Sequence, residues 1–300
     1  MFAAPQINSS EVWANIIPFL DCPALIRTSV VSRDSYAVST APRAWQGREV
    51  HLSTDPAKAA PSTSYLELFT SVTVKFLPRF SDRAPDRDDE AALKVWIANQ
   101  NILLVRLAVH ARRLSTLHLD GETNTSLSTW HALSLLGPQL RKLTIVSGGV
   151  SSSLCAATNK EAGDAKCDWA NGSHPLLPLL QKCSQLQEFV GHTVFWSQFS
   201  GEPSLLKVLA DATRTAASLK VVDVSWSDEG VTIESLRDLV QASPHLERFK
   251  CVCRAPGRGG PGSGSHIPVA TAMAVLQDCK HVEIMTGSGG VTKPAPMLFT

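Results

Sequence analysis

The sequence predicts an α/β solenoid in which a helical module precedes repeats with parallel strands on the concave face and helices on the convex face. Three observations predict this fold. A short apolar pattern recurs from about Leu114 onward, with intervals in the twenties between clear copies. Helix-like segments lie between the copies of this pattern. The first part of the chain instead holds short helix-like segments separated by prolines.

The composition supports a folded protein and limits the classes of partner. With 44% hydrophobic and 18% charged residues, the 300-residue chain has ample material for a core, which excludes wholesale disorder. Lysine and arginine total 28, aspartate and glutamate total 27, and the net charge is +1. Binders of nucleic acid or of membrane surfaces usually carry a basic excess, so we expect neither partner.

Cysteine usage and the start of the sequence predict the compartment. The seven cysteines are odd in number and scattered, whereas a disulfide framework is typical of shorter secreted chains. Residues 1–6 lack the basic and apolar regions of a leader, and no apolar run approaches the roughly 18 residues of a membrane span. We therefore expect a soluble, reduced, intracellular protein that is cytoplasmic, nuclear or both.

Residues 1–47 predict a module of three short helices. The apolar residues of the first helix fall on one broad face. Pro23 suits the first turn of a second helix that carries Leu25. A third helix is expected over 34–40, and Trp45 closes the module. A module of this size buries little apolar surface alone, so it needs a partner or the following domain.

Residues 48–113 are expected to hold a linker and divergent first repeats. Val50 and Leu52 suit a first strand beside the module. The segment 65–74 suits a short helix followed by a strand, and 91–113 predicts one longer helix that leads into the first regular repeat.

Regular repeats are expected over 114–286. The apolar pattern Leu114-x-x-Leu117-x-Leu119 returns at Leu140, Leu219 and Leu246, with degenerate copies at Leu186 and Val282. The copies at 114 and 140 lie 26 residues apart, and those at 219 and 246 lie 27 apart. Longer gaps coincide with inserts near 151–173 and 254–265, and 287–300 is expected to be a flexible tail.

Helix-like runs separate these copies. They cover 127–136, 205–217 and 233–242, and Thr232 is placed as the N-cap of the last run. A period in the twenties, in which a short alternating strand precedes a helix, is typical of leucine-rich repeats. No single repeat can bury its own apolar faces, so neighbouring repeats stack around one continuous core. The alternative is a set of unrelated amphipathic elements in an ordinary α/β fold.

The N-terminal module carries a specific set of residues in order. They are Ile7, Glu11-Val12, Ile16-Ile17, Phe19-Leu20-Asp21, Ala24-Leu25, Arg27, Val30-Val31-Ser32-Arg33, Tyr36, Pro42 and Trp45. This set resembles an F-box, the adaptor-binding module of SCF-type cullin–RING ubiquitin ligases, although Asn8 stands where the family usually has proline. Leucine-rich repeats commonly follow F-boxes. Cys183 and Cys279, just before two strands, resemble the cysteine-containing repeats of that family.

The resemblance implies a non-catalytic substrate receptor. The F-box would dock on the SCF adaptor subunit and, through it, on a cullin, while the repeats bind a protein target and promote its ubiquitination by proximity. The adaptor-binding residues that it implies are Ile7, Ile16, Ile17, Leu20, Leu25, Val31 and Trp45. The alternative is a leucine-rich-repeat scaffold outside the ubiquitin system, with the N-terminal helices as a solenoid cap. A third reading, an RNA-associated protein that uses the segment around Arg258, is disfavoured by the near-neutral charge.

Residues between the apolar anchors are expected to bind the target, because side chains alternate along a strand. They are Thr116, His118, Asp120, Lys142, Thr144, Glu188, Val221, Asp223, Ser225, Arg248 and Lys250. The mixed charges of these residues do not indicate whether the partner surface is acidic or basic. Trp196 and Trp226, just past two strands, are candidate anchors of a binding patch or half-buried structural residues.

The sequence contains no catalytic or cofactor-binding motif that would indicate an enzyme. Cys251-x-Cys253 lacks a second pair at zinc-finger spacing, so we interpret Cys251 as a core thiol. The spacing of Cys155, Cys167 and His174 fits no familiar zinc site. We therefore expect no catalytic residue, no metal and no cofactor.

Overall fold

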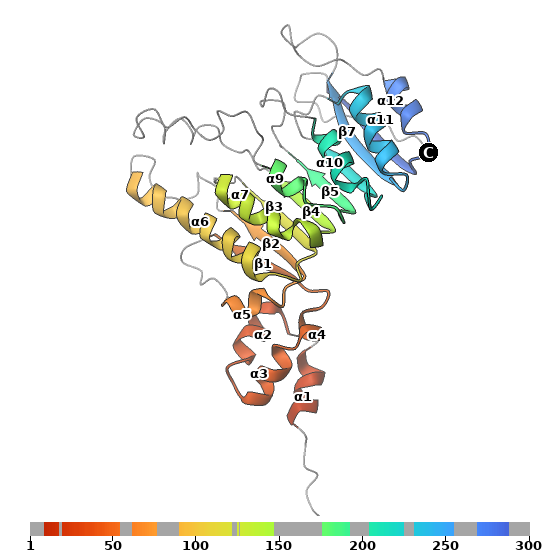
Figure 1. The fold of residues 1–300 in the computed structure, drawn as a ribbon. Helices are drawn as coiled ribbons and strands as arrows, with labels where there is room; N and C mark the ends of the chain where they lie inside the picture. The colour runs from red at the N-terminus through yellow and green to blue at the C-terminus, as the bar shows by residue number, and fades with distance from the viewer. Residues whose placement is uncertain are drawn as a thin grey trace, which may run out of the picture.

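The computed structural model describes residues 9–17, 20–54, 62–76, 90–121, 125, 127–146, 176–192, 204–224, 231–254 and 269–287. Its central feature is an eight-stranded sheet whose strands follow one another in sequence order (Figure 1). Every neighbouring pair is parallel. The strands are β1 (Glu49–Ser53), β2 (Ser71–Lys75), β3 (Thr116–Asp120), β4 (Lys142–Val146), β5 (Glu188–Gly191), β6 (Val221–Val224), β7 (Arg248–Arg254) and β8 (His281–Gly287).

A helical segment follows each of the first seven strands, and these segments line one face of the sheet (Figure 1). Parallel neighbours need a crossover connection, and right-handed crossovers put all the helices on the same side. The helical segments are α5 (Thr63–Leu66), α6 (Glu90–His110), α7 (Leu127–Leu133) with the 3₁₀ helix η2 (Ser134–Gln139), α9 (Leu177–Leu180), α10 (Leu205–Thr213), α11 (Ile233–Ala242) and α12 (Val269–Val275). The described part of the chain is therefore an open α/β structure consistent with a solenoid.

Four helices precede the sheet and project from its first strands (Figure 1). They are α1 (Ser9–Ile16), α2 (Cys22–Thr28), α3 (Arg33–Ser39) and the short α4 (Pro42–Trp45). Side chains fix their starts: the Ala24 amide donates to Asp21 at 2.7 Å, and Ser32 and Ser35 form a reciprocal capping box at the start of α3. We call residues 9–45 the N-terminal helical unit.

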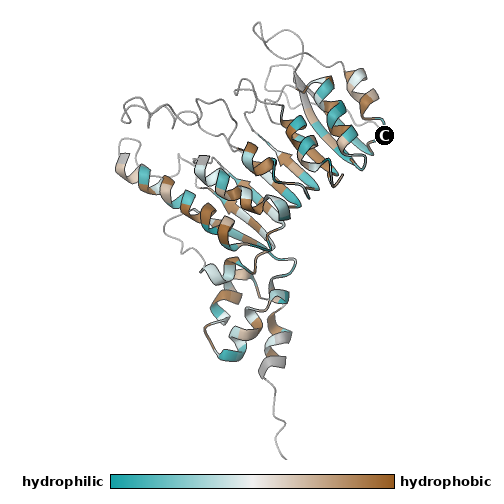
Figure 2. Cartoon of the chain, in the orientation of Figure 1, coloured by the Kyte–Doolittle hydropathy of each residue, from teal (hydrophilic) through white to brown (hydrophobic). Residues whose placement is uncertain are grey.

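The core follows the strand register. Inward residues that are partners in neighbouring strands form a continuous row in which each side chain is fully buried (Val72, Leu117, Leu143, Phe189, Val222 and Phe249). The alternation of hydrophobic and hydrophilic positions along the strands can be followed in Figure 2. The predicted anchors of the repeats lie in one core cluster that extends from the N-terminal helical unit to β8.

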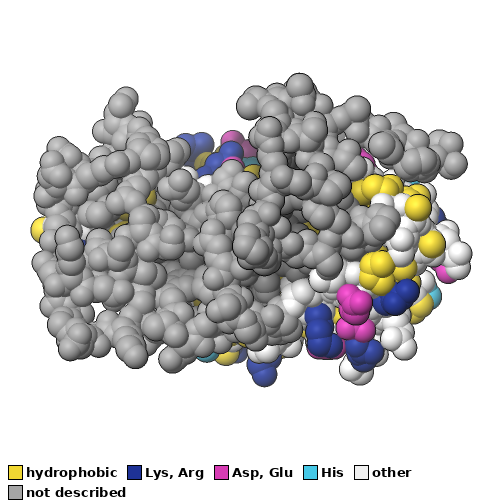
Figure 3. Space-filling view, turned by 90° about the horizontal axis from the view of Figure 1, so that it is seen from above, with side chains coloured by type: hydrophobic (Ala, Val, Ile, Leu, Met, Phe, Trp, Pro, Cys, Tyr) yellow, Lys and Arg dark blue, Asp and Glu magenta, His cyan; other side chains and the backbone are white. Residues whose placement is uncertain are grey.

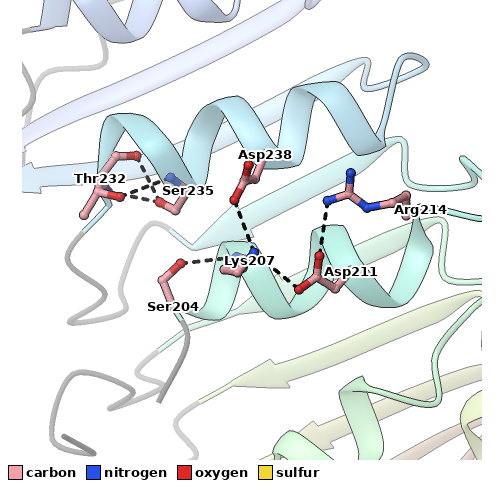
Figure 4. Close-up of polar contacts among 7 residues, drawn as sticks. All are labelled: Ser204, Lys207, Asp211, Arg214, Thr232, Ser235 and Asp238. Carbon is pink, nitrogen blue, oxygen red and sulfur yellow. Dashed lines mark hydrogen bonds and ion pairs between the residues drawn. The ribbon is translucent and has the colours of Figure 1, made fainter. Parts of the chain in front are cut away.

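Ion pairs within α10 and between α10 and α11 lie on the outer surface of the helix layer (Figure 4). Lys207 Nζ lies 3.6 Å from Asp211 within α10 and 3.5 Å from Asp238 on α11. Arg214 adds a 3.2 Å contact to Asp211. These pairs are exposed, so each contributes at most about 1 kcal/mol, and the apolar faces beneath them dominate the packing.

The predicted elements are confirmed with three differences. The helix over 233–242 begins and ends as predicted and has Thr232 as its N-cap. The helix predicted over 205–217 ends at Thr213 and is followed by a turn. The helix predicted over 127–136 gives way after Leu133 to η2, which contains Pro138, because proline lacks the N–H that an α-helix requires.

The third difference concerns the N-terminal module, in which a fourth short helix, α4, follows the three that were predicted. The predicted strand and short helix–strand segment before residue 114 form β1, α5 and β2, and both strands belong to the same sheet as β3. The divergent first units expected over 48–113 are thus part of the same sheet. The predicted inserts and tail lie outside the described residues, apart from Arg254 and Gly287 at the ends of strands.

Gly137 tests the spacing between neighbouring units. A Cβ at this position would lie 2.5 Å from Lys182 Cβ and 2.9 Å from the Lys182 carbonyl carbon. We expect Gly137→Ala to lower the free energy of unfolding by about 1–3 kcal/mol, because the backbone of the next unit must move. The control Gln181→Ala alters an exposed neighbour and should change it by less than about 0.5 kcal/mol. Urea denaturation followed by circular dichroism measures both, and equal stabilities would contradict this packing.

Candidate functional site

The N-terminal helical unit presents five large apolar side chains to solvent. They are Val12, Ile16, Val30, Val31 and Tyr36, with exposed fractions of 40%, 39%, 85%, 67% and 52%. We call them the exposed apolar set. Val30 and Val31 lie in the turn between α2 and α3, where neither helix covers them. Single exposed apolar residues are common, and five within one small unit make this set a candidate contact surface.

The structure divides the predicted adaptor-binding residues into exposed and buried ones. Ile16 and Val31 are exposed. Ile17, Leu25 and Trp45 are 5%, 0% and 0% exposed, so in this structure they pack inside the protein and present no contact surface. Their side chains fill the junction with the sheet, because so small a unit has little core of its own.

Leu20 and Ile7 are the remaining residues of the predicted adaptor-binding set. Leu20 is partly buried and packs against the same core, so it offers little contact surface. Ile7 lies outside the described residues. The residues that the predicted contact set missed are Val12, Val30 and Tyr36, although all three belong to the F-box-like pattern. The sequence carried a signal for these three residues: each short helix has more apolar residues than its buried face can hold, so some of them must be exposed.

Trp45 joins the N-terminal helical unit to the sheet. Its ring lies 5.8 Å from the ring of Tyr65 and 5.2 Å from that of Phe69, both tilted. Its Nε1 donates a hydrogen bond of 2.7 Å to the Ser39 carbonyl, so the indole is satisfied as well as buried. The hydroxyl of Tyr65 also hydrogen-bonds that of Ser29 in the N-terminal helical unit.

Arg48 makes a second, polar connection at the same junction. Its Nε donates to the Ala44 carbonyl at 2.6 Å and Nη2 to the Ile17 carbonyl at 2.7 Å, while Nη1 donates to the Leu20 carbonyl. One guanidinium thus satisfies carbonyl groups from the end of α1 and from α4. Together with Trp45 it fixes the N-terminal helical unit on the first strand.

The predicted target-binding residues lie together on the strand face that the helices leave uncovered. All those that the structure describes are exposed or partly exposed, and they alternate with buried anchors. The strand register arranges them in two rows, Thr116–Lys142–Glu188–Val221–Arg248 and His118–Thr144–Val190–Asp223–Lys250. Asp120 lies at the end of β3 beside Val146. Ser225, Trp196 and Trp226 lie outside the described residues.

Ion pairs between neighbouring strands balance the charges of this face. Lys142 Nζ lies 2.8 Å from Glu188 Oε2, and Lys250 Nζ lies 3.3 Å from Glu283 Oε2. His192 Nε2 lies 3.3 Å from Asp223 Oδ2. Acidic and basic side chains also lie next to one another elsewhere, on the described surface at the right-hand end of the molecule in Figure 3. The described charges of this face are therefore largely paired and give it no single net sign.

The strands at both ends of this face were expected, but their outward residues were not among the predicted target-binding residues. His51 and Thr73 continue the second row through β1 and β2, although Thr73 is only 2% exposed, and Glu283 continues it through β8. Val190 and His192 on β5 were also missed. The signal was the same two-residue alternation, which the degenerate first and last copies obscured.

The cysteines that the structure describes are structural. Cys251 is 1% exposed, which confirms a core thiol. Burial raises the pKa of the Cys183 thiol to about 12 and that of Cys279 to about 11, and it also raises the pKa of Cys22. Thiols with such pKa values remain protonated at neutral pH and are poor nucleophiles. Among the described residues, no group of histidine, cysteine and carboxylate side chains is arranged to hold a metal, and no helix is long and apolar enough to span a membrane.

Comparisons with known proteins identify no family. No family model and no curated protein matches the sequence. Among solved structures, a chain of "Crystal structure of Rad7 and Elc1 complex in yeast" is similar, with 15% sequence identity and a TM-score of 0.38. The match covers 81% of this chain and 54% of that one, so this chain spans about half the length of the chain that it matches.

Arg48 provides a test of the junction. We expect Arg48→Met to lower the stability of the N-terminal helical unit by about 1.5–3 kcal/mol, because three carbonyls lose a charged donor. Hydrogen exchange should accelerate in α1–α4 and stay unchanged in β4–β6. The control Arg43→Met removes an exposed arginine from the same unit and should leave exchange as in the parent. Equal exchange in the two variants would mean that Arg48 does not secure the junction.

Proposed function

We propose that this chain is a non-catalytic substrate-recognition subunit of an SCF-type ubiquitin ligase. The N-terminal helical unit docks on the adaptor, which connects it to a cullin, and the strand face binds a protein target. The catalytic subunits then act on a target that is held nearby, so this chain contributes proximity rather than chemistry.

The observation that carries the proposal is the exposed turn at Val30 and Val31. Both belong to the set of residues that resembles an F-box, and both remain exposed although the unit packs other apolar residues into the core. Covering an exposed valine gains about 1.5–3 kcal/mol. Val12, Ile16 and Tyr36 extend the same apolar surface on α1 and α3, which supports docking of a protein partner there.

One observation favours a second candidate function. Ile17, Leu25 and Trp45 belong to the same core cluster as the repeats, so the unit also shields the open N-terminal end of the sheet. A solenoid needs such a cap whatever its function. The second candidate is therefore a leucine-rich-repeat scaffold outside the ubiquitin system, and adaptor binding separates the two.

The exposed turn tests adaptor docking. We expect Val30→Asp combined with Val31→Asp to weaken capture of the SCF adaptor at least about tenfold, because two apolar contacts are replaced by charges. The fold should survive, since neither side chain is in the core. The control Leu135→Asp adds a charge at an exposed leucine of η2, outside the unit, and should bind as the parent does. Unchanged adaptor binding by the folded double variant would favour the cap alone.

The strand face tests target binding separately. Reversing the charges of Lys142, Asp223 and Lys250 places like charges opposite Glu188 and Glu283 and removes the carboxylate beside His192, and it should change the set of proteins captured by proximity labelling. Stability should change little, because these pairs are partly exposed. Adaptor recovery should stay as in the parent. Loss of the adaptor with an unchanged target set would reverse the two assigned surfaces.

A further inference from the structure

Basic side chains gather in the connections that lead from the helices into strands β3–β8. Because all neighbouring strands are parallel, these connections lie along one edge of the sheet, the edge that carries the N-terminal helical unit (Figure 1). We call this set of connections the basic edge. It comprises residues 111–115, 140–141, 181–187, 214–220, 243–247 and 276–280.

The basic edge has a charge of its own. It contains seven lysine and arginine residues but only two acidic ones, Glu247 and Asp278, so its net charge is +5. The whole chain has a net charge of +1, so the remaining residues together carry −4. The positive charge is thus concentrated on one edge of a nearly neutral protein. Clustered charge of one sign attracts a partner of the opposite sign.

Four of the basic residues form a cluster at the starts of β3–β5, where the basic edge has no acidic residue. They are Arg112, Arg113, Arg141 and Lys182, and all four are exposed. Within the part of the chain that the structure describes, no ion pair joins any of the four to a carboxylate. Their charges are therefore available to a partner.

Backbone contacts hold these four residues close together. Gln139 Nε2 donates a hydrogen bond of 2.9 Å to the carbonyl of Ala111, the residue before Arg112. The Arg141 amide donates to the Ser115 carbonyl at 2.8 Å, which joins the connections into β3 and β4. Lys182 packs against Gly137 so closely that a Cβ on the glycine would overlap with it. The cluster is therefore built on a fixed framework.

Helix dipoles explain only part of the basic edge. A cation within the last turn of a helix stabilises the helix end, and Arg112, Lys182 and Arg214 follow helix ends by one or two residues. Lys220 and Lys280 instead lie seven and five residues beyond the preceding helices and stand directly before β6 and β8. Their place is set by the strand starts, which face solvent along the edge.

Glu247 shows how this edge holds a carboxylate. Lys280 Nζ lies 3.2 Å from Glu247 Oε1. The amides of Glu247 and Arg248 both donate to the Lys220 carbonyl, at 2.8 and 3.0 Å, so these residues adjoin one another. The hydrogen bond from Lys280 and its charge, with smaller contributions from the charges of Lys220 and Arg248, lower the pKa of Glu247. Three cations thus surround one carboxylate and keep it ionised.

We propose that the basic edge binds an extended protein segment rich in aspartate and glutamate, which runs across the strand starts from Arg113 to Lys280. Six neighbouring strand starts span about 24 Å, the length of roughly seven or eight extended residues. Arginine and lysine pair with carboxylates through charge-assisted hydrogen bonds. Assigning the segment to the target of a ubiquitin ligase rests on the proposed function, whereas binding of the segment itself does not.

The residues of the edge favour an acidic protein segment over a nucleic acid. Single-stranded nucleic acids are typically held by bases stacked on aromatic side chains as well as by cations. The six connections contain no phenylalanine, tyrosine or tryptophan. Carboxylates need no stacking surface, and Glu247 already occupies such a place within the edge.

Fluorescence anisotropy of labelled octaglutamate, titrated with the full chain at low ionic strength, tests the proposal. The parent should bind octaglutamate at least about tenfold more tightly than octaglutamine, because only the former carries carboxylates. Arg113→Glu combined with Arg141→Glu should weaken octaglutamate binding at least about tenfold. The control Arg43→Glu combined with Arg237→Glu changes the net charge equally at exposed positions outside the edge and should bind as the parent does. Equal binding of the two peptides, or equal weakening in the control, overturns the proposal.

Two further measurements separate the outcomes. Arg113→Lys combined with Arg141→Lys keeps the charges and should retain binding within about threefold, so a loss there would mean that charge is not the cause. A DNA strand of eight thymidines should bind less tightly than octaglutamate, and tighter binding of DNA would overturn the acidic segment in favour of a nucleic acid. Adaptor capture by the Arg113→Glu, Arg141→Glu variant should equal that of the parent. Peptide binding and adaptor docking can therefore fail independently.

Discussion

The structure depends on one constraint: the inward side of each strand can be buried only by the neighbouring units. Leu117 on β3, Leu143 on β4 and Phe189 on β5 are partners in register, and each is fully buried. Burying one such side chain contributes about 1.5–3 kcal/mol, so a single unit has too little core to fold alone. The same constraint leaves an uncovered core at both ends of the sheet. The N-terminal helical unit covers the first end with Ile17, Leu25 and Trp45.

The pleat that buries these residues also determines the outer strand face. Because side chains alternate, every buried anchor is flanked by residues that point away from the core, and the parallel register aligns them across strands. Lys142 therefore meets Glu188, and Lys250 meets Glu283, as consequences of the same register that aligns the core. The strand face that we propose for recognition therefore follows from the repeat itself, because the register that aligns the core also aligns the outward side chains.

The sequence predicts the repeats well because their signal is local. The pattern beginning at Leu114 places three anchors within six residues, and all three are fully buried. The N-terminal unit was harder, since α2 and α3 have seven residues each and several apolar positions compete for one short buried face. Leu25 and Trp45 are apolar residues of the F-box-like pattern, like Val31, and only the tertiary contacts with Tyr65 and Phe69 show that Trp45 is internal. The exposed apolar residues of α6 gave no signal for a similar reason, because apolar residues on both faces of α6 leave no clear amphipathic period.

Rigid attachment of the two surfaces matters for a receptor that acts by proximity. A tethered target gains effective concentration only while the connection holds it near the catalytic subunits, and a flexible joint spreads the target over a larger volume. Here the joint between adaptor-facing helices and strand face has no flexible linker among the described residues: residues 20–54 run from α2 through β1. At this joint, Trp45 packs against the ring of Phe69, and Arg48 donates hydrogen bonds to the carbonyls of Ile17, after α1, and of Ala44 in α4. Under the proposed function, Ile17, Leu25 and Trp45 would serve docking indirectly, because they hold the exposed apolar set at a fixed position relative to the strand face.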